Sequence, residues 1–553
     1  MGSDLDRQYD KNLAKLTAPG GRLIIDRDER GQAIVTNFPN TIPALLRTFC
    51  ALHGEAEALA AGDERFTFAD LDRISERLAH GLVARGIGKG DRVGIAMRNC
   101  PSWVIAYMGI VKAGAVATLL NGWWEAQELQ HALELTEPAL IIADEPRAKR
   151  LARCPRNFSV IAISIDQPVE TALAELLNDA DESLPLPDVA PEDDATILFT
   201  SGSTGESKGA LSTHRAVTTA TYAYATGLLV LLQVLTDENR APAHQARVLL
   251  SVPLFHVTGE VPVMINSFVI GRCMVVMPKW DASEALRLIE KEKITYFVGV
   301  PTMSLELMTH PDRHKYDLSS LTDITAGGAP RPVSHVERLK AEFPGAQPAL
   351  GYGLTETNAA GCANFWGSYA AKPASTGRAQ KPYVELAILG EGDRHLAVGE
   401  VGEIAIRGAM NIKEYWRNAE ATKALFTHDG YVRTGDVGYL DGDGYLFIVD
   451  RKKEIIIRGG ENISAAEVEA ECYACPDVAE AVVFGVPDER LGEVPIAVIH
   501  PRDGLSEAEL RAFLEERIAR FKVPERIIFS EEPLPRLGTG KIDRRVLKEQ
   551  YAR

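Results

Sequence analysis

Residues 200–209 read TSGSTGESKG, and this stretch decides the fold and the chemistry expected of the chain. It combines three glycines and a run of hydroxyl side chains with one lysine, Lys208. Glycines allow successive backbone N–H groups to point at an oxyanion, and hydroxyl groups add further donors. The flanking residues 195–199 (ATILF) and 210–214 (ALSTH) are typical of strands. The sequence therefore predicts a strand–loop–strand cradle for an anion, although the segment by itself could also be a flexible surface loop.

The spacing of this loop differs from that of a nucleotide-binding P-loop. The pattern GxxxxGK[ST] requires a glycine where Ser207 stands and a hydroxyl residue where Gly209 stands. P-loop chemistry is therefore disfavoured.

Outside the loop, helical and strand-like segments alternate along the chain. Residues 66–91 carry apolar side chains at helical spacing and end in glycines that suit a helix C-terminus. A second helix is predicted from residue 101 to 113, and short apolar runs predict strands at 91–97, 248–254, 273–278 and 294–301. Such alternation indicates α/β layers with largely parallel sheets. We expect the first 40 residues to be a loosely structured lead-in.

Composition excludes several classes of protein. The chain has 553 residues with 60 Lys and Arg against 77 Asp and Glu, a formal charge of −17. A nucleic-acid binder usually carries a basic face, so we expect no nucleic-acid partner, and cations for an anionic ligand must be local. The seven cysteines are few and odd in number, which disfavours a disulfide framework and favours a reducing, cytoplasmic location. Cys472 and Cys475 have CxxC spacing, but without a second pair we expect a plain helical position.

No segment is long and apolar enough to predict a transmembrane helix. The most apolar stretch, residues 223–235, falls short of the roughly 20 residues needed to span a bilayer, and we expect it to be a buried helix. Peripheral contact with a membrane and a monomeric or homodimeric state are both compatible with the sequence.

The character of the chain changes near residue 450. A charged segment, Arg451-Lys452-Lys453-Glu454, separates the α/β pattern from about 100 residues of compact α+β pattern. It lacks the Pro, Gly and Ser of a floppy linker, so it indicates a hinge. We therefore predict an α/β fold with a large multi-sheet N-terminal domain (1–450) and a small mobile α+β C-terminal domain (451–553), hinged near Lys453.

Four further motifs follow the loop in order. They are GYGLTET (351–357), TGD (434–436) with Arg451 after it, RGGENIS (458–464) and PRLGTGK (535–541). Together with the loop, this ordered set resembles the acyl-adenylate-forming superfamily of acyl-CoA synthetases, luciferases and peptide-synthetase adenylation domains. The resemblance covers roughly residues 40–550. The chain departs from the family at Ser207, where proline is usual before the lysine.

The resemblance implies the substrates ATP and coenzyme A (CoA), the cofactor Mg²⁺, and a role for each motif. Lys541, Thr355, Glu356 and Lys208 would be catalytic: Lys541 would bridge the substrate carboxylate and the α-phosphate, which Thr355 also contacts, while Glu356 would bind Mg²⁺. Tyr352 would stack on adenine, and Asp436 and Arg451 would bind the ribose. The remaining implied nucleotide contacts are Thr200, Ser201, Gly202, Ser203, Thr204, Gly205, Gly351 and Gly353. CoA would pass Arg458, Gly459 and Gly460.

Elementary chemistry agrees with these roles. Attack of a carboxylate on a phosphate brings two anions together, and a divalent cation with a mobile lysine can neutralise the developing charge. A carboxylate such as Glu356 is the ligand type that Mg²⁺ prefers.

The acyl substrate is the least determined feature. The family resemblance assigns the acyl pocket to Phe255, His256, Val300, Ala326, Gly327, Gly328 and Ala329. Peptide-synthetase domains commonly have Asp where His256 stands, so an amino-acid substrate is disfavoured. Small residues at 326–329 leave space, and each buried methylene contributes about 0.8 kcal/mol. We expect a medium- or long-chain fatty acid; the alternative is an aromatic acid such as a cinnamate or benzoate, because GYGLTET also resembles coumarate ligases.

Three functions are compatible with these residues. The first is an acyl-CoA ligase that forms acyl-AMP and then transfers the acyl group to CoA. The second is an acyl-AMP ligase that loads a carrier protein. The third is a non-catalytic binding protein, which the presence of Lys541, Glu356 and Lys208 disfavours, or a luciferase-like oxidant, which is compatible with the composition but would also require a specialised luciferin.

Overall fold

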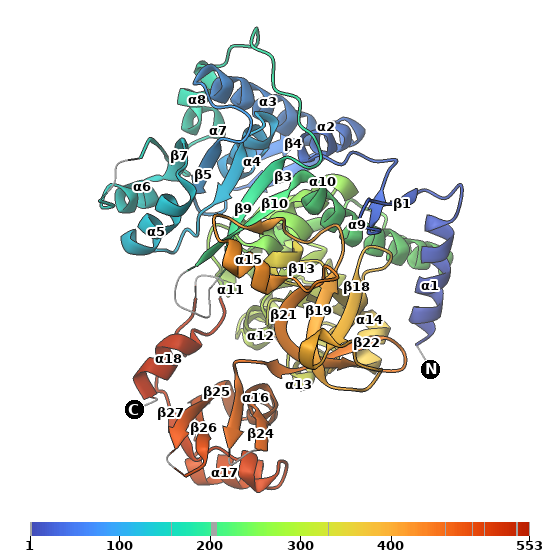
Figure 1. Ribbon diagram of the computed structural model, residues 1–553, viewed down its shortest axis with the longest axis vertical. Coiled ribbons are helices and arrows are strands. Elements are labelled where there is room, and N and C mark those ends of the chain that lie inside the picture. The colour runs from blue at the N-terminus through green and yellow to red at the C-terminus, as the bar shows by residue number, and fades with distance from the viewer. Residues whose placement is uncertain are drawn as a thin grey trace.

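The computed structural model describes residues 3–155, 158–200, 207–329, 331–458, 461–488, 490–502, 504–537 and 540–551. Two large β-sheets with their helices form the main body, together with a two-stranded sheet of β1 (Ile25–Arg27) and β2 (Ala33–Val35), and a third multi-stranded, smaller sheet lies in a C-terminal lobe beneath it (Figure 1). The predicted fold class is confirmed: a large multi-sheet α/β part precedes a smaller α+β part.

The first large sheet has seven strands, and it carries the glycine- and hydroxyl-rich loop. In spatial order they are β20 (Glu414–Tyr415), β10 (Lys208–Thr213), β9 (Asp194–Thr200), β6 (Val116–Leu119), β5 (Arg92–Ala96), β7 (Leu140–Asp144) and β8 (Val160–Ile163). The strands from β9 to β8 are parallel, whereas β10 and β20 are antiparallel additions. Strands β6 and β7 are buried along their whole length, as expected for a parallel sheet covered on both faces.

The second sheet has thirteen strands. In spatial order they are β18 (Glu385–Leu389), β19 (Gly402–Arg407), β21 (Val432–Leu440), β22 (Tyr445–Arg451), β17 (Gly377–Ala379), β16 (Cys362–Phe365), β15 (Gln347–Tyr352), β14 (Asp323–Gly327), β13 (Tyr296–Gly299), β11 (Arg247–Leu250), β12 (Cys273–Val276), β3 (Glu57–Ala61) and β4 (Glu64–Thr67). The strands from β3 to β15 pair in parallel, and those from β15 to β18 pair antiparallel. The parallel part therefore gathers the carboxyl ends of β13, β14 and β15 at one edge.

The third sheet forms the C-terminal lobe. Its strands are β24 (Glu461–Ser464), β23 (Ile455–Arg458), β26 (Gly492–Pro501), β25 (Val478–Asp488) and β27 (Arg526–Phe529). The chain leaves the thirteen-stranded sheet at the end of β22 and enters this one at β23. Lys453 lies in that short connection, and its role as a hinge stays a prediction.

The longer helices cover the sheets much as their sequence patterns predict. Helix α3 begins after Thr67, whose hydroxyl accepts from the Asp70 N–H in a capping box. The larger helices are α2 (Ile42–His53), α3 (Phe68–Ala84), α4 (Pro101–Lys112), α5 (Ala126–Thr136), α9 (His214–Asp237), α11 (Ala282–Glu292), α12 (Pro301–Thr309), α13 (Val333–Glu342), α16 (Ala465–Ala474), α17 (Glu507–Glu515) and α18 (Arg544–Tyr551). Shorter ones are α6 (Glu145–Leu151), α7 (Val169–Ala172), α8 (Ala174–Asn178), α10 (Asn266–Ile270), α14 (Trp366–Ala371) and α15 (Ala419–Leu425).

Helix α9 extends well beyond the apolar stretch that predicted it. Among the described residues it is the one helix long and apolar enough to cross a membrane, and 72% of its most apolar window is buried inside the protein. This burial is typical of a core helix. Cys472 lies within α16 and Cys475 directly follows its end, both buried, so the predicted helical position is confirmed for Cys472.

The prediction of a loosely structured lead-in is wrong for the first residues. Asp4–Thr17 form helix α1, capped by Ser3 and lying along the side of the main body (Figure 1). Its buried Asp6 accepts hydrogen bonds from the hydroxyls of Tyr445 (2.7 Å) and Ser368 (2.9 Å). These partners lie more than 360 residues away in the sequence, which is why the local pattern did not reveal the helix as a packed element.

Candidate active site

The glycine- and hydroxyl-rich loop joins two paired strands, as predicted. Strands β9 and β10 are antiparallel, and Thr200 lies opposite Lys208 where they meet the loop. The predicted contacts Ser201, Gly202, Ser203, Thr204 and Gly205 lie outside the described residues. The ammonium of Lys208 lies 5.0 Å from the centre of the Tyr415 ring, a distance at which the cation is attracted to the ring face.

The motif GYGLTET lies at the end of β15 and in the following short 3₁₀ helix, η3 (Thr355–Thr357). Strand β15 carries Gly351 and Tyr352, and Gly353 follows it. The side chain of Glu356 accepts a hydrogen bond of 2.6 Å from the hydroxyl of Tyr415, and its carbonyl accepts one from the N–H of Ile412.

Tyr415 therefore links two predicted catalytic residues, Lys208 and Glu356, and sequence reasoning missed it. It belongs to β20, which pairs with β10 so that Tyr415 lies opposite Ala210. No motif surrounds Tyr415 in the sequence. Only the pairing of strands about 200 residues apart could have revealed it.

Glu356 is suited to hold a divalent cation together with a phosphate ligand. Its Oε1 is occupied by Tyr415, and its Oε2 has no hydrogen-bond partner among the described residues. Nowhere among the described residues do three or more His, Cys, Asp or Glu side chains form a group that could hold a metal ion by themselves. Mg²⁺ commonly binds through one or two carboxylates plus substrate phosphates, so a single free carboxylate oxygen fits that mode.

Tyr352, Asp436 and Arg451 form a connected trio. The Tyr352 hydroxyl donates to Asp436 Oδ2 at 2.6 Å, and Arg451 Nε lies 3.2 Å from Oδ1. Asp436 and Arg451 are direct partners in the β21–β22 ladder, which explains their proximity. Burial raises the pKa of Asp436, and the Arg451 charge and the Tyr352 hydrogen bond oppose that rise. Thus the predicted adenine and ribose residues lie together, with Asp436 placed as an acceptor of two hydrogen bonds.

Lys541 reaches this trio from the C-terminal lobe. Burial lowers the pKa of Lys541 to about 8; the positive charge of Arg451 adds to the lowering, and Asp436 opposes it. The lysine also lies against the turn after β14, because a Cβ on Gly328 would meet Lys541 Cε at 3.1 Å. Gly328 has a φ of +74°, a conformation that favours glycine.

His256 lies close enough to Lys541 to feel its charge. Burial and the Lys541 charge together lower the pKa of His256 to about 3, so the imidazole is neutral at physiological pH. A neutral ring beside a lysine can accept or donate one hydrogen bond, and it adds no charge to the site.

Three predicted acyl-pocket residues lie near Lys541 or the adjacent Gly540: His256, Val300 and Gly328. Phe255, Val300 and Ala326 are buried, whereas Gly327 and Ala329 are half-buried. Gly327 pairs with Gly351 across β14 and β15, which places the acyl wall beside the nucleotide motif. A Cβ on Gly540, next to Lys541, would meet Val300 at 3.2 Å.

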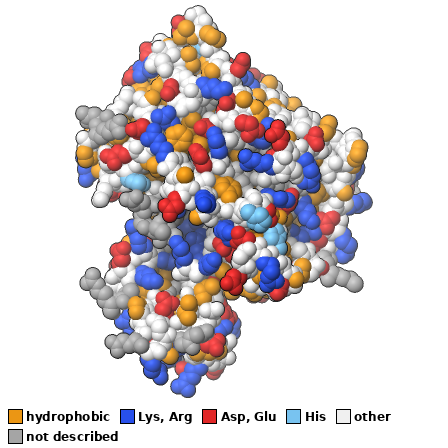
Figure 2. Space-filling view, in the orientation of Figure 1, with side chains coloured by type: hydrophobic (Ala, Val, Ile, Leu, Met, Phe, Trp, Pro, Cys, Tyr) orange, Lys and Arg blue, Asp and Glu red, His pale blue; other side chains and the backbone are white. Residues whose placement is uncertain are grey.

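Of the predicted CoA residues, the structure describes Arg458. Arg458 donates to the carbonyl of Phe521 at 2.6 Å and pairs with Glu525 at 2.9 Å, both within the C-terminal lobe. Gly459 and Gly460 lie outside the described residues. Figure 2 shows Lys and Arg side chains in the recess between the lobe and the main body.

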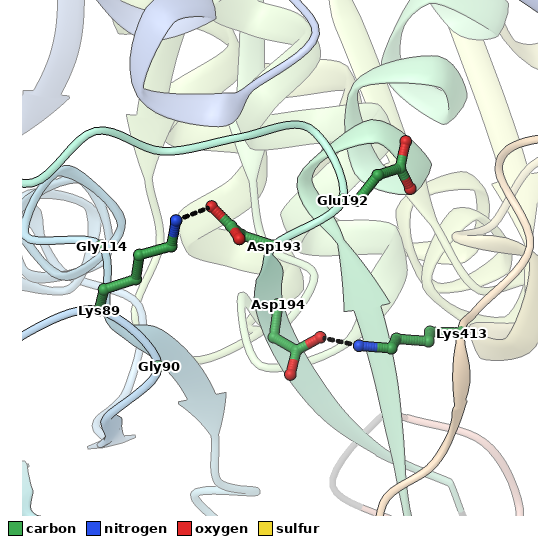
Figure 3. Close-up of a pocket in the computed structure, with 7 residues that line it drawn as sticks. All are labelled: Lys89, Gly90, Gly114, Glu192, Asp193, Asp194 and Lys413. Atoms are coloured by element: carbon green, nitrogen blue, oxygen red, sulfur yellow. Dashed lines mark hydrogen bonds and ion pairs between the residues drawn. The ribbon is translucent and has the colours of Figure 1, made fainter.

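A cavity of about 180 Å³ at the far end of β9 is not part of the site (Figure 3). Its two lysines are paired, Lys89 with Asp193 at 2.6 Å and Lys413 with Asp194 at 2.7 Å. Asp194 begins β9 and Thr200 ends it, so about 20 Å of strand separates this cavity from the loop.

Comparison with known proteins agrees with this arrangement. Residues 46–416 match the family described as AMP-binding enzyme, and residues 467–541 match its C-terminal domain. The chain is 34% identical to a long-chain-fatty-acid–CoA ligase of Bacillus subtilis, over 93% of this chain and 95% of the relative. It is 35% identical to a feruloyl-CoA synthase of Amycolatopsis, over 88% and 94%. The solved structure of ATP-bound MatB from Rhodopseudomonas palustris superposes with a TM-score of 0.81 and 28% identity, over 93% of this chain and 99% of that one.

Proposed function

The chain belongs to the AMP-binding enzyme family and is an ATP-dependent acyl-CoA ligase, and we propose that its acid substrate is a medium- or long-chain fatty acid. The resemblance to the acyl-adenylate-forming superfamily is confirmed at the level of the family. Relatives named for a fatty acid and for an aromatic acid are about equally similar to the chain, so the acid has to be inferred from the acyl wall as well.

The proposed residue roles rest on one observation: predicted nucleotide residues and predicted acyl-pocket residues both lie next to Lys541. One ammonium group lies beside the Asp436–Arg451 pair and against Gly328 of the acyl wall. A lysine in that position can contact a carboxylate and a nucleotide phosphate at the same time. Lys541 is half-buried between two sets of predicted ligand residues, unlike a lysine on an open surface.

In the proposed first step, a carboxylate oxygen of the acid attacks the α-phosphorus of ATP. The bond from that phosphorus to pyrophosphate breaks, and acyl-AMP forms. The Lys541 ammonium would stabilise the negative charge on the carboxylate and α-phosphate as they approach, with Thr355 donating to the same phosphate. Mg²⁺ held at Glu356 would supply further positive charge to the phosphates.

In the proposed second step, the sulfur of CoA attacks the acyl carbonyl, and AMP leaves. Arg458 and the neighbouring glycines, predicted for CoA, lie in the lobe that carries Lys541. We propose that the lobe turns about Lys453 between the steps, withdrawing Lys541 and presenting the Arg458 face.

The preference for a fatty acid rests on the small, apolar acyl wall. Ala326 and Val300 are buried and apolar, and Gly327 has no side chain to obstruct an acyl chain beside them. Each methylene taken out of water contributes about 0.8 kcal/mol, so a longer acid gains affinity cumulatively. The B. subtilis relative named for long-chain fatty acids supports this choice.

An aromatic acid is the second candidate. The Amycolatopsis relative is named a feruloyl-CoA synthase and is as similar to this chain as the fatty-acid ligase. Measuring ATP–pyrophosphate exchange with a panel of acids distinguishes the two. We expect exchange with octanoate and longer acids; exchange with benzoates or cinnamates but not with octanoate or longer acids would overturn the fatty-acid proposal. Release of AMP on addition of CoA would then report the complete reaction.

A further inference from the structure

Arg536 organises the loop that carries Lys541. The loop is closed by backbone hydrogen bonds from Leu537 N–H to the Lys541 carbonyl and from Asp543 N–H to the Pro535 carbonyl, both 2.7 Å. Across it, the guanidinium of Arg536 donates to the carbonyl of Gly540 at 2.9 Å. A change in the position of the Arg536 side chain therefore affects Gly540, the residue next to Lys541.

The same guanidinium lies between two carboxylates of different origin. Glu480, on β25 of the C-terminal lobe, is buried and accepts hydrogen bonds from Arg536 and from Leu534 N–H. Glu306, on α12 of the main body, has its Oε1 3.7 Å from Arg536 Nη2. Its other oxygen accepts a hydrogen bond of 2.5 Å from the indole of Trp280, which holds the carboxylate in place.

We propose that the Glu306–Arg536 pair is a latch that positions Lys541 for adenylation. The bonds of Arg536 to Glu480 and Gly540 are internal to the lobe and would survive its rotation. The Glu306 contact spans the lobe and the main body, so it exists only in the arrangement that brings Lys541 to Gly328. Helix α12 also begins directly after Val300, which lies close to Gly540. The loop therefore contacts α12 near its start, at Val300, and along its length, at Glu306. Arg536 and Glu306 are thus positioning residues, and their role rests on the proposed two-step reaction.

A latch of this kind must be weak. Both partners are partly exposed, Arg536 at 26% and Glu306 at 42%, and exposed ion pairs shift an equilibrium by up to about fivefold. A weak contact suits a lobe that has to leave after each adenylation.

The first test compares the two half-reactions in Glu306→Gln. Glutamine keeps an acceptor for Trp280 but removes the charge that faces Arg536. We expect ATP–pyrophosphate exchange to fall by up to about fivefold, while thioester formation from supplied acyl-AMP and CoA stays unchanged or rises. Glu306→Asp should restore part of the exchange rate. Equal loss in both half-reactions, or no loss of exchange, would overturn the proposal.

A matched control is available on the neighbouring helix. Glu284 on α11 is also partly exposed and pairs with Arg287 at 2.6 Å, but both residues belong to the main body. Glu284→Gln should leave both half-reactions as in the wild type. A fall in exchange equal to that of Glu306→Gln would assign the effect to surface charge in general and would count against a latch.

A second test needs no acid substrate. Hydrogen exchange of the peptide spanning residues 534–542 should be faster in Glu306→Gln than in the wild type, and unchanged in Glu284→Gln. If the wild type shows no ATP–pyrophosphate exchange with any fatty acid, the proposed substrate fails, yet this measurement still tests the latch. Identical exchange of the peptide in wild type and Glu306→Gln would overturn it.

Discussion

The surroundings of Lys541 disfavour its charged form, and the resulting low pKa should be visible in the pH dependence of the reaction. Burial lowers its pKa to about 8, so the ammonium form is lost as the pH rises through 8. If the ammonium stabilises the first step, kcat/KM for adenylation should fall above about pH 8, because that quantity reports the free enzyme. Lys541→Ala should lower exchange by several orders of magnitude, yet retain thioester formation from supplied acyl-AMP. An exchange rate in the wild type that does not fall above about pH 8, or equal loss of both half-reactions in Lys541→Ala, would refute the assignment.

Glu260 is a buried acid outside the residues that the motifs identified. Its side chain accepts a 2.8 Å hydrogen bond from Tyr107, while its other oxygen has no partner among the described residues. It belongs to a π-helical segment, η1 (Gly259–Ile265), one turn after His256. Burial raises the pKa of Glu260 to about 7, so the folded protein keeps the carboxyl protonated where the unfolded chain ionises.

This raised pKa predicts a pH-dependent stability. The unfolded carboxyl releases its proton near pH 4.5 and the folded one near pH 7, so stability falls as the pH rises between these values. The shift corresponds to about 3 kcal/mol, and Glu260→Gln should remove that loss. Urea unfolding of both proteins at pH 5 and pH 8 measures it. If the unfolding free energy fell equally in the two proteins between pH 5 and pH 8, Glu260 would already be ionised in the folded protein at pH 5.

At the scale of elements, helix α1 is hydrogen-bonded to β22, the strand that precedes the predicted hinge. Asp6 accepts from Tyr445 at the start of β22, and the neighbouring Asp10 pairs with Arg378 on β17 at 2.9 Å. Asp6→Ala leaves the buried hydroxyl of Tyr445 without its acceptor, whereas the hydroxyl of Ser368 keeps its 2.7 Å hydrogen bond with Ser3. We therefore expect a loss of about 1–3 kcal/mol in unfolding free energy. Asp4→Ala, which removes exposed contacts with Arg7 and Gln8, should cost less than about 1 kcal/mol. Similar losses in the two variants would contradict a stabilising role of the Asp6–Tyr445 hydrogen bond.

At the scale of the whole molecule, the proposed reaction needs two arrangements of one lobe. The connection between β22 and β23 is the point where the chain passes from one sheet to another. Lys453→Pro restricts the backbone there, so we expect it to slow thioester formation at least several-fold more than adenylation. Single-turnover measurements of each half-reaction check this. Wild-type rates for both would exclude Lys453 as the hinge.

The net charge of −17 also belongs to this scale, and it acts only as background. The cations predicted to meet ATP and the acid are few and placed individually: Lys208 beside Tyr415, Arg451 beside Asp436, and Lys541 from the lobe. An acidic protein can therefore bind anionic substrates, because short-range contacts in a recess outweigh a distant, screened charge.

The local sequence determined the elements and the residues with chemical roles. Apolar periodicity and caps predicted α3 and α4, and the strand-like flanks predicted β9 and β10, because these signals depend on neighbours a few residues apart. The motifs brought forward Glu356, Asp436 and Lys541 as candidates, because the residue types and the order of the motifs resemble those of the family. The family followed from the order of those motifs.

Only the tertiary structure decided how these residues meet. Tyr415 binding Glu356, Asp6 beneath Tyr445, and Arg536 between Glu480 and Glu306 all join residues more than 50 positions apart. Such contacts depend on strand order and on the packing of one lobe against another, and no periodic pattern records either. The sequence alone therefore determined which groups the protein possesses, and the fold decided their distances, their burial and hence their charge states.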